Sequence, residues 1–198
     1  MKKIAICGPS GVGKGFICNR IGSEFGFPVL DTDRVVHDMY EKDPVVINDL
    51  VGIFGNKILK NGSIDRRALG SIVFCDPQAL DTLNKTVHKH VRSHMLLWFK
   101  AMEELGFDAA VVDIPQIVES GMAGDFDLVI GIEAELHTRM ERITARDGIS
   151  AEDARRRIEN QLPAEEYRKV CHYTVKNDGP DSFSFDSIKN IFKEVHII

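Results

Sequence analysis

The sequence lacks both a long apolar run and an excess of basic charge. No stretch approaches the ~18 apolar residues of a membrane helix, and the short apolar run after Met1 ends at Gly8, too early for a secretory signal. The formal net charge over 198 residues is −5, whereas broad nucleic-acid binding relies on basic surface. We therefore expect a cytoplasmic protein with neither membrane nor nucleic-acid partners. No pattern in the sequence indicates an oligomeric state.

Cysteine is also scarce. The four cysteines, Cys7, Cys18, Cys75 and Cys171, are widely spread, and they form no CxxC pair and have no histidine at metal-ligand spacing. The pattern predicts buried free thiols in a reducing compartment.

Short unbroken apolar runs alternate with helical patterns along the chain. Runs of this kind are typical of parallel strands covered on both faces, and they lie at residues 3–7, 28–30, 109–114, 127–132 and 173–175. We predict an α/β fold of three layers with a five-stranded parallel sheet. The predicted parts are a nucleotide-binding core (residues 1–59 and 106–198), a helical insert (60–105) and a helical lid (about 136–162).

A glycine-rich loop follows the first predicted strand. Residues Gly8-Pro9-Ser10-Gly11-Val12-Gly13-Lys14 match the first seven positions of a phosphate-binding P-loop. Glycines let backbone N–H groups converge on phosphate oxygens, and the next helix points its positive N-terminal end at the same anion. Lys14 adds a charge for the β- and γ-phosphates. The strand before the loop and the helix after it argue against an unrelated glycine-rich turn.

The eighth position of the P-loop pattern departs from the usual residue. Ser or Thr there normally helps to hold Mg²⁺, but this chain has Gly15 followed by Phe16. The string Gly-Pro-Ser-Gly-x-Gly-Lys-Gly resembles the loop of cytidylate and adenylate kinases, which carry Thr after the last glycine. We expect Mg²⁺ to be held through phosphates and water, with Asp33 or Asp113 as the nearby carboxylate.

Three aspartates lie at or near the carboxyl ends of predicted strands, where ligands gather in open parallel sheets. They are Asp31, Asp33 and Asp113. If strand geometry continues, Asp31 and Asp33 point the same way, so one could reach an acceptor hydroxyl while the other orients it or holds Mg²⁺ through water. Alternatively, Asp33 caps the helix expected to begin at Arg34. Asp113 has either a metal-binding or a structural role.

An arginine-rich segment lies in the predicted lid. Arg142 and Arg146 are four residues apart and share a helical face. Kinases use such arginines to cover the transferring phosphoryl group and exclude water. For residues 155–157 we favour a solvated face paired with acidic neighbours.

In their order and spacing, these motifs resemble those of the dephospho-coenzyme A kinases, a family of P-loop kinases, over about residues 4–179. Asp31-Thr32-Asp33 corresponds to the family's Asp-Ala-Asp, and residues 142–148 keep its Arg-x-x-x-Arg-Asp-Gly signature. Residues 115–119 correspond to its Pro-Leu-Leu-x-Glu, and Gln161 to its downstream glutamine. The departures from the family pattern suggest a divergent branch: Cys7, Pro9, Gly15, Lys89, Gln116 and His172.

The resemblance implies an ATP-dependent enzyme that phosphorylates the ribose 3′-hydroxyl of dephospho-coenzyme A, the last step of coenzyme A biosynthesis. It implies catalytic roles for Asp33, Lys14 and Arg142, and it places Asn177 beside adenine. The implied ATP-binding residues are Gly8, Gly11, Val12, Gly13, Lys14, Gly15, Phe16, Arg146 and Asn177. The implied acceptor-binding residues are Asp31, Arg66, His88, Pro115 and Glu119.

Two alternatives remain at this point. The loop string by itself favours a nucleoside monophosphate kinase. Gly15 with Phe16 favours a P-loop protein that binds ATP but has weak catalysis or none.

Overall fold

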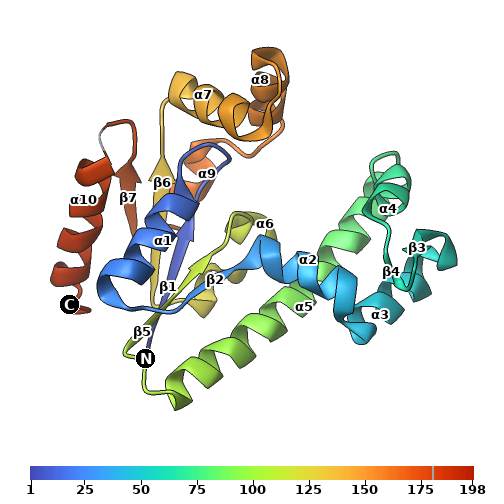
Figure 1. Ribbon diagram of the computed structural model, residues 1–198, viewed down its shortest axis with the longest axis horizontal. Coiled ribbons are helices and arrows are strands. Elements are labelled where there is room, and N and C mark those ends of the chain that lie inside the picture. The colour runs from blue at the N-terminus through green and yellow to red at the C-terminus, as the bar shows by residue number, and fades with distance from the viewer. Residues whose placement is uncertain (180) are drawn as a thin grey trace. The chain divides into compact units, whose positions relative to one another are not determined.

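A computed structural model describes residues 1–179 and 181–198 (Figure 1). The chain divides into two compact units. The first unit comprises Met1–Leu30 and Ala101–Ile198, and the second comprises Asp31–Lys100. The second unit begins earlier than the predicted insert at 60–105, because the helices that follow Asp31 pack with the rest of the insert.

The sheet of the nucleotide-binding core has five strands in the order β2-β5-β1-β6-β7. Strand β1 pairs in parallel with β5 and β6, and β6 pairs in parallel with β7. The strands are β1 (Lys2–Cys7), β2 (Val29–Asp31), β5 (Ala109–Asp113), β6 (Leu128–Glu133) and β7 (Tyr173–Lys176). The predicted five-stranded parallel sheet is therefore confirmed, with each strand within two residues of its expected position.

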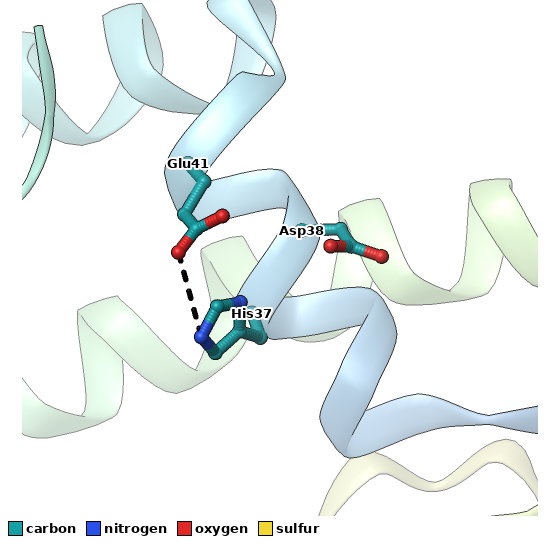
Figure 2. Close-up of side chains that lie close together, drawn as sticks. All are labelled: His37, Asp38 and Glu41. Atoms are coloured by element: carbon teal, nitrogen blue, oxygen red, sulfur yellow. Dashed lines mark ion pairs between the residues drawn. The ribbon is translucent and has the colours of Figure 1, made fainter.

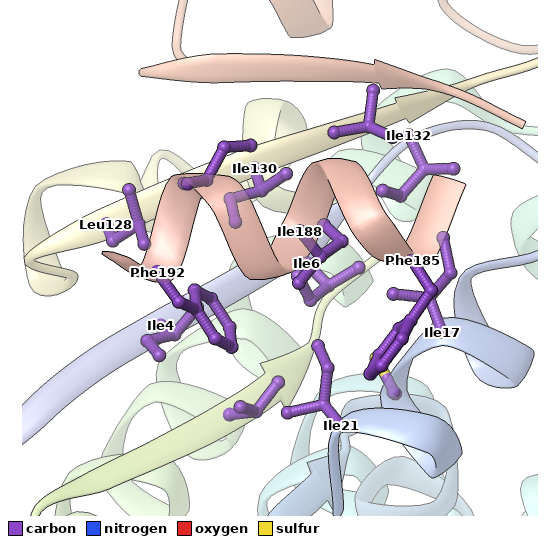
Figure 3. Packing of buried hydrophobic residues seen from close by; sticks show 14 of the residues in the cluster. Ile4, Ile6, Ile17, Ile21, Leu128, Ile130, Ile132, Phe185, Ile188 and Phe192 are labelled. Carbon is purple, nitrogen blue, oxygen red and sulfur yellow. The ribbon is translucent and has the colours of Figure 1, made fainter. Parts of the chain in front are cut away.

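Helices cover both faces of this sheet. On one face, α1 (Lys14–Phe25) and α10 (Asp181–Glu194) share the main apolar core with β1 and β6. Figure 3 shows Phe185, Ile188 and Phe192 of α10 directed toward the isoleucines of the sheet. On the other face, α9 (Ala164–Arg168) packs on β6, and α6 (Ile117–Ser120) packs on α9. Full burial of one such apolar side chain stabilises the fold by about 1.5–3 kcal/mol, which explains why these strands are apolar on both faces.

Several helix ends carry the residue types that favour helix ends. Gly26 adopts a left-handed φ of 71° after α1, and its N–H donates to the carbonyl of Gly22 at 3.0 Å. Asp65 and Asp76 accept backbone N–H groups at the starts of α4 (Arg66–Val73) and α5 (Pro77–Glu104). The predicted lid consists of two helices in the first unit, α7 (Leu136–Asp147) and α8 (Ala151–Glu159).

The second unit is helical apart from one hairpin. Its remaining helices are α2 (Thr32–Lys42) and α3 (Pro44–Phe54), and strands β3 (Leu59–Lys60) and β4 (Ser63–Ile64) pair antiparallel. Asn61 and Gly62 both have positive φ, 53° and 83°, as a two-residue hairpin turn requires. Short 3₁₀ turns lie at Asn56–Ile58 in this unit and at Met122–Asp125 in the first.

Two further sequence predictions can be compared with the structure. In the described part of the chain, no helix combines the length and apolarity needed to cross a bilayer. Cys7 and Cys18 are buried as predicted, whereas Cys75 is exposed and Cys171 is only partly buried. The prediction of four buried thiols is therefore wrong for the latter two.

Candidate functional site

The phosphate loop spans the turn between β1 and α1. Gly8 and Gly13 have φ values of 135° and 89°, a region that side chains with a Cβ rarely adopt. A Cβ on Gly8 would collide with the carbonyl oxygen of Ile132, and one on Gly13 would collide with the side-chain amide of Asn177. Both positions therefore require glycine. Because glycine has no side chain, the backbone N–H groups of the loop can approach a phosphate closely.

Lys14 folds back over this loop. Its Nζ donates to the carbonyl oxygens of Gly8 at 2.8 Å and Pro9 at 3.2 Å. The ammonium group therefore lies at the loop itself, at the first residue of α1, where the helix N-terminus also favours an anion. Of the two residues that follow, Gly15 is on the first turn of α1 and Phe16 is 44% exposed.

Two residues from the lid region bind the backbone of Ser10 in the loop. Arg139 Nε on α7 donates to the Ser10 carbonyl oxygen at 2.9 Å. Gln161 Oε1 accepts from the Ser10 N–H at 3.0 Å and from Arg139 Nη2 at 3.1 Å. Burial lowers the pKa of the Arg139 guanidinium from its ordinary value. Arg139 received no binding role from the sequence, and Gln161 was noticed only through the family resemblance.

The two arginines of the lid signature also reach the loop. Arg142 Nη1 donates to the carbonyl oxygens of Val12 at 3.2 Å and Gly11 at 3.4 Å. Arg146 is bound mainly to Asp147, at 2.7 and 2.9 Å, with Nη2 also 3.5 Å from Ser10 Oγ. The hydrogen bond from Arg146 holds the pKa of the Asp147 carboxyl below its usual value. The structure thus brings both predicted lid arginines to the phosphate loop.

The three arginines at residues 155–157 form ion pairs with acidic neighbours, as predicted for a solvated face. Arg155 pairs with Glu159 at 2.9 Å, and Arg156 pairs with Asp153 at 2.5 Å. Arg157 pairs with Asp147.

Asn177 lies beneath the loop. It is only 3% exposed, and its Nδ2 donates to the Val12 carbonyl oxygen at 2.7 Å. Val12 itself is fully buried. In this arrangement, Asn177 braces the loop from the end of β7, while the contact with adenine stays a prediction.

Three further candidates lie at or just after the carboxyl end of β5 in the first unit. Asp113 is the last residue of that strand and is in register with Ile6 of β1, so its carboxylate lies at the edge of the sheet that carries the phosphate loop. Pro115 is partly buried in the turn that follows, and Glu119 is exposed on α6. Burial raises the pKa of the Tyr167 phenol most, and the negative charge of Glu119 raises it further.

The structure corrects the expectation for Asp31 and Asp33. Helix α2 already begins at Thr32, and Asp31 Oδ1 caps it by accepting the N–H groups of Asp33 at 2.9 Å and Arg34 at 3.2 Å. The premise that both carboxylates extend from a continuing strand is wrong, and so is the alternative in which Asp33 is the cap. The first N–H groups of a helix have no partner within the helix, and an aspartate side chain can accept them. With Asp31 as the cap, α2 begins at the next residue, Thr32. Asp33 is exposed on the first turn of α2.

The other two predicted acceptor residues also belong to the second unit. Arg66 is exposed at the start of α4, with its guanidinium 5.6 Å from the ring centroid of Tyr40. His88 is partly buried on α5. The neighbouring Lys89 lines an open groove of about 540 Å³ between α3 and α5, where His90 Nε2 lies 2.8 Å from Asp49 Oδ2.

One surface cluster on α2 has the composition of a metal site but not its environment. Potential ligand atoms of His37, Asp38 and Glu41 lie within 4.8 Å of one another (Figure 2). All three side chains are exposed, and the Lys42 ammonium lies 3.5 Å from Asp38 and 4.0 Å from Glu41. A cation at this position competes with a metal ion, so we interpret the cluster as solvated ion pairs.

Comparisons with known proteins agree with this geometry. The model of the family described as "Dephospho-CoA kinase" matches residues 3–182. The chain is 33% identical to a dephospho-CoA kinase of Bacillus anthracis, with 98% of each chain covered. A relative of the same name from Corynebacterium glutamicum is 30% identical, with 98% of this chain and 100% of the relative covered.

Solved structures give the same result. TT1252 from Thermus thermophilus matches with a TM-score of 0.79 and 29% identity, over 98% of this chain and 97% of that one. The dephospho-CoA kinase from Campylobacter jejuni matches with a TM-score of 0.70 and 26% identity over 98% of both chains. Shikimate kinase from Acinetobacter baumannii, at 14% identity and a TM-score of 0.55, shares the P-loop kinase fold. This chain belongs to the dephospho-CoA kinase family.

Proposed function

We propose that this protein transfers the γ-phosphoryl group of ATP to the ribose 3′-hydroxyl of dephospho-coenzyme A, which completes coenzyme A biosynthesis. Two observations support the proposal together. The chain belongs to this family, and the side chains of Lys14, Arg139 and Arg142 all bind its phosphate loop. A cytoplasmic location stays a prediction from the sequence.

In the proposed mechanism, the loop and its basic neighbours bind the phosphates of ATP. Backbone N–H groups between Gly11 and Lys14 hold the phosphate oxygens, since Pro9 has no N–H and that of Ser10 donates to Gln161. Arg146, Phe16 and Asn177 complete the ATP site. Phosphoryl transfer passes through a loose transition state with its charge spread over the equatorial oxygens, so the protein acts mainly by positioning and by electrostatics. Lys14 and Arg142 supply the positive charge that stabilises this state.

On the acceptor side, Asp33 orients the 3′-hydroxyl and takes its proton at a carboxylate oxygen. General-base assistance of this kind is typically worth about 10²–10⁴-fold in rate. The predicted acceptor-binding residues are Asp31, Arg66 and His88 in the second unit and Pro115 and Glu119 in the first. Because the Asp31 carboxylate already caps α2, we assign it the additional role of fixing the backbone on which Asp33 lies.

The residues present fit Mg²⁺ held mainly by phosphates and water. Mg²⁺ prefers oxygen ligands and usually keeps several waters. Gly15 contributes no hydroxyl, whereas Asp113 places a carboxylate at the sheet edge that carries the loop, and Asp33 is the second candidate. When bound, the ion would neutralise charge on the transferring phosphoryl group.

A direct test couples ADP release to an optical readout with dephospho-coenzyme A as acceptor and identifies the product by mass spectrometry. We expect ADP and coenzyme A in equal amounts. Faster ADP release with CMP or AMP would instead support the nucleoside monophosphate alternative, which nothing in the fold or the relatives favours. Folded protein that binds ATP but transfers to no acceptor would support the non-catalytic alternative.

Restoring a hydroxyl after Lys14 tests how the metal is held. A Cβ at Gly15 would have no atom within 4 Å, so Gly15→Ser fits without rearrangement. We expect this variant to need several-fold less Mg²⁺ for half-maximal activity, because the hydroxyl becomes an additional ligand. Gly15→Ala is the matched control, since it adds the same Cβ without oxygen. Identical Mg²⁺ titrations for the two variants would show that water already fills this role.

Removing the Gln161 side-chain amide tests the contacts at Ser10. In Gln161→Ala, the Ser10 N–H and Arg139 Nη2 both lose their acceptor. We expect the KM for ATP to rise roughly three- to tenfold, the equivalent of about one neutral hydrogen bond, with a smaller change in kcat. Arg155→Ala, on the exposed face of α8, should leave both constants unchanged. A Gln161→Ala enzyme with the wild-type KM would contradict a positioning role.

A further inference from the structure

Two cysteines far apart in the sequence meet beside the phosphate loop. The Sγ atoms of Cys7 and Cys171 lie 3.5 Å apart, although 164 positions separate them in the chain. Cys7 is the last residue of β1 and is bonded directly to Gly8 of the loop. Cys171 lies between α9 and β7. The pair thus connects the loop to the segment that follows the lid.

The close approach depends on a missing side chain. Cys7 is paired in register with Gly131 of β6, and Gly131 is paired with Thr174 of β7. A Cβ on Gly131 would lie 2.8 Å from Cys171 Sγ, so the sulfur occupies the space that a side chain there would fill. Glycine in the interior of a strand weakens the strand. Here the absence of a side chain at Gly131 leaves space for Cys171 Sγ to lie over β6 and contact Cys7.

The backbone that carries Cys171 is fixed. Its N–H donates to the Tyr167 carbonyl oxygen at 3.2 Å. The next residue, His172, is bound at both ends: its N–H donates to the Val129 carbonyl oxygen at 2.9 Å, and its Nδ1 accepts from the Val129 N–H at 2.9 Å. Both cysteines therefore lie on hydrogen-bonded backbone, Cys7 in β1 and Cys171 in the segment before β7.

We propose that Cys7 and Cys171 form a reversible oxidation site whose disulfide disables the phosphate loop. The oxidant is a peroxide or a low-molecular-weight disulfide. With hydrogen peroxide, the Cys171 thiolate attacks one peroxide oxygen, the O–O bond breaks, and hydroxide leaves to give a sulfenic acid. The Cys7 thiol then attacks the sulfenic sulfur, an S–S bond forms and water leaves. In total, two thiols and one peroxide give one disulfide and two waters.

The environments of the two thiols suit these different roles. Cys7 is fully buried, whereas Cys171 is only partly buried, so a small oxidant reaches Cys171 more readily. The hydrogen bond between the sulfurs, together with burial, raises the pKa of Cys7, and the same bond lowers the pKa of Cys171. The thiolate is the reactive form, so Cys171 reacts first and Cys7 resolves the sulfenic acid.

The disulfide would displace the start of the loop. An S–S bond is about 2.0 Å long, so the two sulfurs must approach by roughly 1.5 Å. Gly8 cannot absorb this shift freely, because the carbonyl of Ile132 leaves no room beside it even for a Cβ. Misplacing a reacting group by about 1 Å can cost about 10²-fold in rate. The predicted loss of turnover rests on the proposed function, whereas formation of the disulfide and the loss of nucleotide binding do not.

The experiment uses the full-length reduced protein and hydrogen peroxide. After treatment, remaining thiols are alkylated and peptides are mapped by mass spectrometry without reduction. Binding of a fluorescent ATP analogue is measured before oxidation, after it, and after dithiothreitol. We expect a Cys7–Cys171 linked peptide, at least tenfold weaker nucleotide binding, and recovery of both on reduction. Oxidised glutathione in place of peroxide should give the same link.

Three variants make the result specific. Cys171→Ser should form no link and keep its nucleotide binding under oxidation, and Cys75→Ser, which removes an exposed thiol, should behave like wild type. Gly131→Ala retains both cysteines but displaces the Cys171 sulfur, so it should form the link much more slowly; circular dichroism checks that it folds.

Two outcomes would overturn the proposal: oxidation that reaches Cys75 without linking Cys7 to Cys171, or a linked protein with unchanged nucleotide binding. If the linked protein loses nucleotide binding while the reduced protein phosphorylates no dephospho-coenzyme A, the oxidation site stands and the proposed function fails.

Discussion

Lys14→Met is expected to lower kcat/KM by about 10²–10³-fold, the loss typical when one preorganised donor to a transition state is removed. The ammonium lies at the loop, donating to the Gly8 and Pro9 carbonyl oxygens. With ATP bound, we expect it to donate to phosphate oxygens instead, where charge develops during transfer. Methionine has a similar length and no charge, so the variant separates the electrostatic contribution from packing. Steady-state kinetics with dephospho-coenzyme A measures the effect.

The control for this prediction is another lysine of the same unit. Lys169 is exposed, and its ammonium lies 2.6 Å from the carboxylate of the nearby Glu166. Lys169→Met should keep the wild-type kcat/KM, because exposed ion pairs contribute little. Thermal unfolding of both variants should remain within a few degrees of wild type. A Lys14→Met enzyme that turns over within tenfold of wild type would contradict the role of this charge.

The parts of the fold that depend on local sequence could be predicted. The apolar runs specify parallel strands, since only side chains buried on both faces produce such runs. The same holds for Gly26, which ends α1, and for the aspartates that cap α4 and α5, because each acts on backbone within a few residues. The phosphate loop could also be predicted, because its motif lies in consecutive residues, Gly8 to Lys14.

The sequence did not predict which of two carboxylates, two positions apart, is the cap. Asp31 and Asp33 are both good cap residues, and the choice depends on where β2 leaves the sheet. The strand ends at Asp31, so its carboxylate takes the two N–H groups and Asp33 falls inside the helix. The strand end is set by pairing with the neighbouring strand, which single-sequence patterns do not contain.

Contacts between distant residues also escaped prediction. Ser10 meets Gln161 across 151 positions, and Cys7 meets Cys171 across 164. No periodicity connects such pairs; they arise because β1 and β6 are neighbours in the sheet. Gly131 illustrates the difficulty, since in the sequence it is one glycine inside an apolar strand, and only the fold shows that its missing Cβ makes room for a sulfur.

Asp33→Asn is expected to reduce kcat by about 10²–10⁴-fold, with little change in the KM for ATP. The amide keeps the size of the side chain but cannot take the proton of the 3′-hydroxyl. Helix α2 should remain intact, because its cap is Asp31 rather than Asp33. Single-turnover measurements with saturating ATP and dephospho-coenzyme A isolate the chemical step from product release.

Asp31→Asn is the matched variant, and the comparison separates catalysis from capping. Asparagine caps helices about as well as aspartate, so this variant should retain the start of α2 and most of its activity. Asp31→Ala, by contrast, should destabilise the fold by about 0.5–2 kcal/mol and lower kcat indirectly, by loosening the turn that carries Asp33. If Asp31→Asn loses as much kcat as Asp33→Asn, the assignment of Asp33 as the base is wrong, because the Asp31 carboxylate then matters equally for the chemical step.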